Sequence, residues 1–124
     1  MKTTKLPTPS ESHEQQTLMS WWTLACPKGY DPRLLMACPA QAARSPRNGA
    51  RMKAEGYRAG TPDLFLAIPR GTRGGLFVEM KRRDGGTLSE SQREMLFNLS
   101  QQGYATGVAC GWEAAKNMIT EYLQ

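Results

Sequence analysis

The sequence predicts one mixed α/β domain in which helices pack on a central sheet. Three observations indicate it. The chain has 124 residues, the usual length of one domain. Amphipathic helical segments lie near both ends. Between them, short apolar runs alternate with further helical segments, giving the order helix, strand, short helix, strand, strand, helix, strand, helix. No apolar run approaches the roughly 18–20 residues of a membrane span, so we expect no membrane partner.

The N-terminal part predicts a flexible lead at residues 1–9, because prolines interrupt it, and a single domain at residues 10–124. Ser10 is a suitable N-cap for the first helix. The apolar positions of this helix have helical spacing, at Leu18, Trp21, Trp22 and Ala25. Pro27 and Gly29 end it.

The remaining elements follow from apolar runs and turn residues. We expect a buried strand at 34–38, a short helix at 50–57, and strands at 64–68 and 76–81 joined by a Gly-rich hairpin loop at 69–75. Ser89 and Gln92 form a capping box for a helix with a core face at Met95, Leu96 and Leu99. A fourth strand at 104–110 precedes a last helix that begins at Gly111.

The charge of the chain is concentrated in its middle. The formal net charge is +5, and residues 28–83 alone hold 12 Lys/Arg against 4 Asp/Glu. Such a segment is either a solvated basic surface or a footprint for a polyanion such as nucleic acid. The three cysteines are odd in number and include no CxxC pair, so we expect free thiols in a reducing cytoplasm.

The most informative motif is Gly60-Thr61-Pro62-Asp63, which 15 intervening residues separate from Glu79-Met80-Lys81. Glu79 and Lys81 point to one face of their strand, and antiparallel pairing can place Asp63 beside Glu79. Two adjacent carboxylates repel each other, and a divalent cation would use their oxygens as ligands. A lone Glu-x-Lys is more often an ion pair on an exposed strand. In this basic segment the combination favours a metal-dependent phosphodiesterase site.

The chain resembles the VRR-NUC nucleases, a branch of the PD-(D/E)xK superfamily. The resemblance rests on segments in family order: S-E-S-H-E-Q-Q-T-L-M-S-W-W, K-A-E-G-Y-R-A-G-T-P-D-L-F-L, G-L-F-V-E-M-K-R, L-S-E-S-Q and G-Y-A-T-G-V-A-C-G-W-E-A-A. It implies a restriction-endonuclease-like fold, a mixed central sheet flanked by helices. The family includes the nuclease domain of the Fanconi-associated nuclease and compact stand-alone proteins of phages and bacteria, which resemble dimeric enzymes that cut branched DNA.

The resemblance also implies roles for individual residues. Asp63 and Glu79 match the metal-binding carboxylates of the family. The backbone carbonyl of Met80 matches a further metal ligand, and Lys81 matches the catalytic lysine. Gln92 matches a glutamine that places water or phosphate, and its capping role is equally compatible with the sequence. The family also uses a glutamate of the first helix. Glu11 fits that position, with Glu14 as the alternative one turn later.

These features together predict a Mg²⁺- or Mn²⁺-dependent DNA endonuclease, selective for branched DNA such as Holliday junctions, and active as a homodimer in the cytoplasm of a bacterial or phage-infected cell. The alternatives are a non-catalytic nucleic-acid-binding module of the same fold and a sequence-specific nuclease. The expected contacts to the DNA backbone are seven basic residues near the motif: Arg44, Arg47, Arg51, Lys53, Arg58, Arg82 and Arg83.

Overall fold

A computed structural model describes residues 5–39 and 49–124 of the chain. The elements are α1 (Glu11–Ala25), a 3₁₀ turn (Pro32–Leu34), β1 (Leu35–Ala37), α2 (Gly49–Ala54), β2 (Leu64–Leu66), β3 (Leu76–Lys81), α3 (Glu90–Gln101), β4 (Ala105–Cys110) and α4 (Trp112–Tyr122). The expected order of helices and strands is confirmed. None of the helices in these two ranges is long and apolar enough to cross a membrane.

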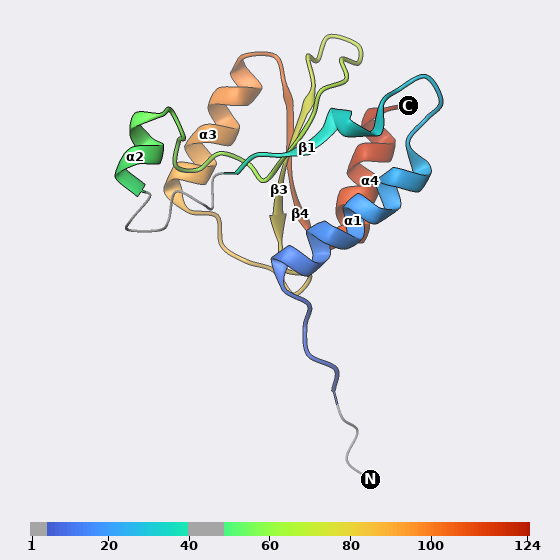
Figure 1. Cartoon of the computed structure of the whole chain (residues 1–124), viewed down its shortest axis with the longest axis horizontal. Helices are drawn as coiled ribbons and strands as arrows, with labels where there is room; N and C mark the ends of the chain where they lie inside the picture. The colour runs from blue at the N-terminus through green and yellow to red at the C-terminus, as the bar shows by residue number, and fades with distance from the viewer. Residues whose placement is uncertain (1–4, 40–48) are drawn as a thin grey trace.

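The four strands form one mixed sheet in the order β1-β2-β3-β4. The pairs β1/β2 and β2/β3 are antiparallel, and β4 is parallel to β3. Figure 1 shows α1 and α4 on one side of this sheet and α2 and α3 on the other. The segment that precedes α1 leads away from the fold, and its described residues, 5–10, contain no helix or strand.

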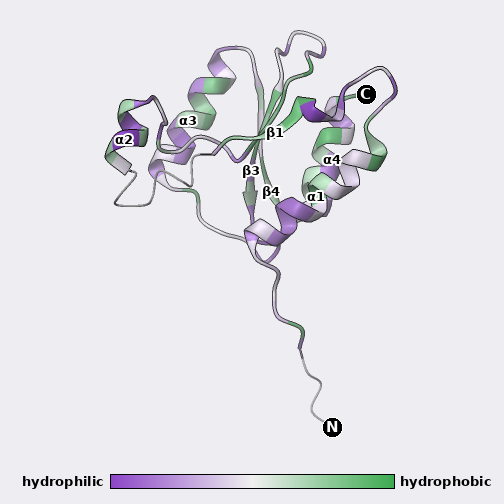
Figure 2. Ribbon diagram, viewed as in Figure 1, coloured by the Kyte–Doolittle hydropathy of each residue, from purple (hydrophilic) through white to green (hydrophobic). Residues whose placement is uncertain are grey.

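The main core lies between the sheet and the α1/α4 pair. Leu18 and Trp22 of α1 are buried there against alternate residues of β3 and against Ile119 of α4. Leu76, Val78 and Met80 form the core-facing side of β3, as their spacing predicts. The indole Nε1–H of Trp22 donates to the carbonyl of Pro32 at 2.7 Å, which satisfies the one polar group of this buried ring. Figure 2 shows the apolar residues gathered along the central strands.

The other face of the sheet carries an aromatic cluster and the polar part of β3. The rings of Phe65 and Phe77 stack at 4.3 Å between centroids, and Tyr104 meets both edge-on. Glu79 and Lys81 follow Phe77 at alternate positions, so they lie on this face, farther along β3. The fold therefore separates its core and its polar cluster onto opposite faces of one strand.

Three sequence expectations need correction. The strand at 34–38 is buried only at Leu35, because β1 is an edge strand and Met36 is 40% exposed. The helix predicted at 50–57 ends at Ala54, where Gly56 adopts a positive φ of 104°. The helix α3 has the predicted capping box, yet its apolar positions are only half-buried, because it covers the sheet at one edge.

The core on the α1 side should carry most of the stability. We expect Leu18→Ala to lower the free energy of unfolding by about 2–5 kcal/mol, because it leaves a cavity in a fully buried site. Leu24→Ala is the matched control on the same helix: Leu24 is 90% exposed, and its loss should change stability by less than about 0.5 kcal/mol. Urea unfolding of the two variants measures this, and equal losses would contradict the described core.

Candidate active site

The site is built on the last residues of β3. Glu79 and Lys81 are only 3% and 8% exposed, although both are charged residue types. They are buried because β3 is an inner strand, with β2 on one side and β4 on the other. The alternative of an ion pair on an exposed strand is therefore wrong. Charged side chains are rarely buried without partners, so the neighbours of this pair decide what it can do.

Asp63 is held against Glu79 by the pairing of β2 with β3. Leu64 lies opposite Val78, so Asp63, one residue earlier, falls opposite Glu79. The Oδ2 atom of Asp63 accepts a hydrogen bond from the backbone N–H of Met80 at 2.7 Å. The N–H and C=O of a strand residue point to the same side, so the Met80 carbonyl also faces the Asp63 side.

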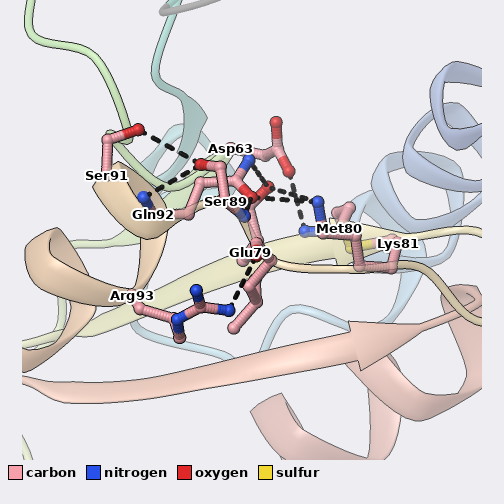
Figure 3. Close-up of polar contacts among 9 residues, drawn as sticks. Asp63, Glu79, Met80, Lys81, Ser89, Ser91, Gln92 and Arg93 are labelled. Atoms are coloured by element: carbon pink, nitrogen blue, oxygen red, sulfur yellow. Dashed lines mark hydrogen bonds and ion pairs between the residues drawn. The ribbon is translucent and has the colours of Figure 1, made fainter.

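Gln92 connects the two charged residues of β3 to the start of α3 (Figure 3). Its Nε2 donates to Glu79 Oε1 at 3.2 Å, and its Oε1 accepts from Lys81 Nζ at 3.1 Å. The same Oε1 accepts from the backbone N–H of Ser89 at 2.9 Å, which completes the capping box. Gln92 thus completes the capping box and contacts both Glu79 and Lys81 in one conformation.

The carboxylate of Glu79 is incompletely satisfied. Its Oε1 receives Gln92 and lies 3.9 Å from Lys81 Nζ, but its Oε2 is buried with no hydrogen-bond partner among the described residues. Burial and the neighbouring Asp63 carboxylate raise the pKa of Glu79 to about 8, and Lys81 offsets only part of this. A buried acceptor beside a second carboxylate is an environment that a cation would stabilise.

The donor set fits a small divalent cation. Mg²⁺ is bound in proteins through one or two carboxylates and keeps several of its waters, so Asp63, Glu79 and the Met80 carbonyl are sufficient in number and kind. Within residues 5–39 and 49–124 no group of three acidic, histidine or cysteine side chains is gathered closely enough to hold a metal by itself. The fit therefore rests on the carboxylate pair and the partnerless Oε2 atom of Glu79.

The structure separates the roles of Glu11 and Glu14. Glu11, in the first turn of α1, lines a cavity of about 370 Å³ together with Asp63 and Glu79. Glu14 is 1% exposed and accepts from Arg83 at both oxygens, at 2.8 and 3.0 Å. The hydrogen bonds from Arg83 lower the pKa of Glu14 below its ordinary value. Of these two glutamates, only Glu11 lines the cavity that contains Asp63 and Glu79.

The predicted backbone contacts fall into several groups. Arg44 and Arg47 lie outside the described residues. Lys53 and Arg58 line the cavity that contains the carboxylates. Three others have acidic partners: Arg51 with Glu55 at 3.7 Å, Arg82 with Asp84 at 3.6 Å, and Arg83 with Glu14 and Glu113.

Sequence reasoning missed part of the cavity wall. Tyr57, Thr61 and Ser91 line it beside the predicted residues. Tyr57 precedes Asp63 by six positions in one loop, which is the only sequence signal that connects it to the site. Ser91 is brought there because Gly60 packs against the backbone of α3: a Cβ at Gly60 would lie 2.2 Å from the Ser91 carbonyl oxygen.

The central mixed sheet has helices on both faces, and it brings Asp63, just before β2, beside Glu79 and Lys81 of β3. These features define the class as a nuclease-type α/β fold. A family model, the VRR-NUC domain, matches residues 8–112, and the chain belongs to this family. A solved structure described as a VRR_NUC domain protein superposes with a TM-score of 0.83 at 28% sequence identity, covering 95% of this chain and 91% of that chain. The restriction-endonuclease-like architecture is thereby confirmed. No curated protein sequence matches the chain.

The raised pKa of Glu79 predicts an unusual pH dependence in protein stripped of divalent metal. Between the ordinary value of 4.5 and about 8, the folded state holds a proton that the unfolded chain has released, so stability should fall as the pH rises through this window. Thermal unfolding in EDTA at pH 5.5 and 8.5 measures the slope. Glu79→Gln should flatten the slope, and Mg²⁺ or Mn²⁺ should raise the Tm of the wild type most at the higher pH. Identical slopes in the two proteins would contradict this electrostatic account.

The Glu14–Arg83 pair predicts that substitutions of the adjacent residues Arg82 and Arg83 lower the stability by different amounts. Arg83→Gln leaves the buried Glu14 carboxylate without its main partner, so we expect a loss of about 2 kcal/mol of stability, below the full value for a buried pair because Arg83 is itself 44% exposed. Arg82→Gln removes an exposed ion pair and should cost less than about 0.5 kcal/mol. Denaturant titration of both variants tests this, and equal stability would show that Arg83 has no structural role.

Proposed function

We propose that this chain is a Mg²⁺- or Mn²⁺-dependent endonuclease that hydrolyses DNA phosphodiester bonds. The observation that carries the proposal is the pairing of Asp63 with the buried Glu79 carboxylate, with Lys81 beside them, in a cavity that basic residues also line. A protein that only binds nucleic acid gains nothing from placing two carboxylates where phosphate would lie. The VRR-NUC family membership agrees with a nuclease.

Asp63, Glu79 and the Met80 carbonyl would hold the cation, with Glu11 as a further acidic group on the same cavity wall. When bound, the cation supplies Lewis-acid activation of the scissile phosphate and of the attacking water. The hydrogen bond from Met80 N–H fixes Asp63, and the amide of Gln92 fixes Glu79, so the two ligands are preorganised.

Lys81 provides the positive charge of the protein itself at the reacting centre. Its ammonium group is held by Gln92 Oε1 at 3.1 Å and is nearly excluded from solvent. In such a site an ammonium stabilises negative charge that develops on the phosphate more strongly than it would in water. It can also orient the attacking water by a hydrogen bond. We therefore assign Lys81 to catalysis and not to general DNA affinity.

The proposed preference for branched DNA and the proposed homodimer rest on size and symmetry. A chain of 13.8 kDa is too small to contact both arms of a four-way junction easily, whereas a two-fold dimer presents two equivalent sites. Phosphate contacts by basic residues do not depend on base identity, so geometry must supply the selectivity. The resemblance to stand-alone VRR-NUC nucleases agrees with this assembly.

Lys81→Ala should lower cleavage by at least about a hundredfold, because transition-state stabilisation by one charged donor is of this size. Binding of a four-way junction should persist, since it depends on many phosphate contacts. Gel assays with labelled junction, flap and linear duplex, in Mg²⁺, Mn²⁺ or EDTA, measure both quantities. Arg73→Gln, at the hairpin between β2 and β3 and far from the Lys81 end of β3, is the charge-matched control. A Lys81→Ala protein that loses binding as completely as cutting would make Lys81 a contact residue. A wild type that binds DNA but cuts no substrate with either metal would be a binding module.

The assembly is tested separately. Sedimentation of the protein should give about twice the chain mass of 13.8 kDa. The junction should be cut much faster than a linear duplex of the same sequence. A monomer that cuts both substrates at equal rates would overturn the dimer and the branch preference, while the metal-dependent chemistry would stand.

A further inference from the structure

The basic residues near the site differ in whether an acidic side chain already neutralises them. Among the described residues, Arg51, Arg82 and Arg83 each form an ion pair. Lys53 and Arg58 form none within the part of the chain that the structure describes. These same two residues, and none of the paired three, line the cavity that contains the carboxylates. The uncompensated positive charge is thus placed beside the reacting centre.

The cavity itself has two chemically different sets of lining residues. Glu79 and Lys81 of β3 line it together with Asp63, and α2 and the loop after it contribute Lys53, Tyr57 and Arg58. Its volume of about 370 Å³ is at the lower end of the range for small-molecule sites, roughly 300–1,000 Å³. A space of this size suits one nucleotide unit.

The wall with Tyr57 is built by defined backbone contacts. The N–H of Tyr57 donates to the Met52 carbonyl at 3.0 Å, and the N–H of Gly56 donates to the Lys53 carbonyl at 3.1 Å. With Gly56 at positive φ, this is a Schellman motif, which fixes the residue after the glycine. The following turn is anchored by the close approach of Gly60 to the Ser91 backbone. Tyr57 and Arg58 are therefore held between two fixed points.

We propose that Lys53, Tyr57 and Arg58 form a nucleotide subsite that binds the nucleotide next to the scissile phosphate. The two cationic side chains bind the flanking phosphate, and the phenol ring of Tyr57 stacks on the base. A base can stack on a side chain only after it leaves its own stack, which is easiest in unpaired or distorted DNA. The subsite rests on the proposed nuclease function. It would make a single protomer prefer DNA near a branch point, where bases are unpaired or distorted.

The test measures binding without cleavage. A single-stranded oligonucleotide with 2-aminopurine is titrated into the Lys81→Ala protein, and fluorescence reports stacking of the base. We expect Tyr57→Leu to weaken binding about tenfold and to remove the quenching, because stacking on an aromatic side chain is worth a factor of this order. Tyr57→Phe keeps the ring and should retain both. A Tyr57→Leu protein that is folded and still binds and quenches like its parent would overturn the subsite.

The matched charge variants are Lys53→Gln and Arg51→Gln, which remove one positive charge each from the same short helix. Lys53→Gln and Arg58→Gln should each reduce the slope of log affinity against log salt by up to about 0.7, the value for the one single-strand phosphate contact that they share. Arg51→Gln should have a smaller effect, because Glu55 already pairs with it and it does not line the cavity. If Arg51→Gln and Lys53→Gln changed this slope equally, the two positive charges would contribute only a general electrostatic attraction, and the subsite would be overturned.

Failure of the subsite and failure of the nuclease proposal give different results. If the wild type cuts DNA and the Tyr57→Leu protein binds and cuts as well, the subsite alone is wrong. If binding depends on Tyr57 and Lys53 as described but the wild type cuts no substrate with any metal, the nuclease proposal alone is wrong.

Discussion

The register between β2 and β3 is the constraint on which the site depends. Because Leu64 pairs with Val78, the residue before β2 and the residue after Val78 meet, and both are acidic. A shift of one residue would turn Glu79 and Lys81 toward the apolar core and Val78 toward the polar face, so the hydrophobic contacts that stabilise the sheet also fix the chemistry. The close contact of Gly75 with Phe65 and the Leu66 carbonyl pins the same register at the far end of the two strands, where no side chain larger than hydrogen fits.

Burying Glu79 and Lys81 on one strand, with the Asp63 carboxylate beside them, is unfavourable unless each has partners, and other parts of the structure supply most of these partners. The backbone N–H of Met80 donates a hydrogen bond to Asp63. Gln92, in the first turn of α3, forms hydrogen bonds with both Glu79 and Lys81. Among the residues that the structure describes, none forms a hydrogen bond with the remaining oxygen, Glu79 Oε2. The same glutamine closes the capping box of α3, so the position of that helix and the geometry of the two charged side chains are coupled: a change in one moves the other.

A second ion pair ties α1 to the exit of β3. Arg83 reaches back to Glu14, and its contact with Glu113 extends the link to the start of α4. Glu14 is therefore occupied in joining three elements, whereas Glu11, three residues earlier, is left to face the cavity. This arrangement also removes Arg83 from the set of freely available cations, in contrast to Lys53 and Arg58. The distribution of positive charge around the site is thus set by which arginines the fold uses for its own packing.

The sequence by itself determined the element order, the two faces of β3, the capping box and the Asp63–Glu79–Lys81 cluster. Each of these depends on local spacing: a period of two in a strand, a period of 3.6 in a helix, and a hairpin that joins neighbouring strands. It could not determine the exposure of β1, because edge position is decided by which strand finds no second neighbour. Nor could it choose between Glu11 and Glu14, which share one helix face, or show that Tyr57 lines the cavity. Those outcomes depend on Arg83, 69 residues from Glu14, and on the approach of Gly60 to α3. Contacts between residues so distant in the chain leave no periodic pattern in the sequence. Only the tertiary structure therefore decided these outcomes.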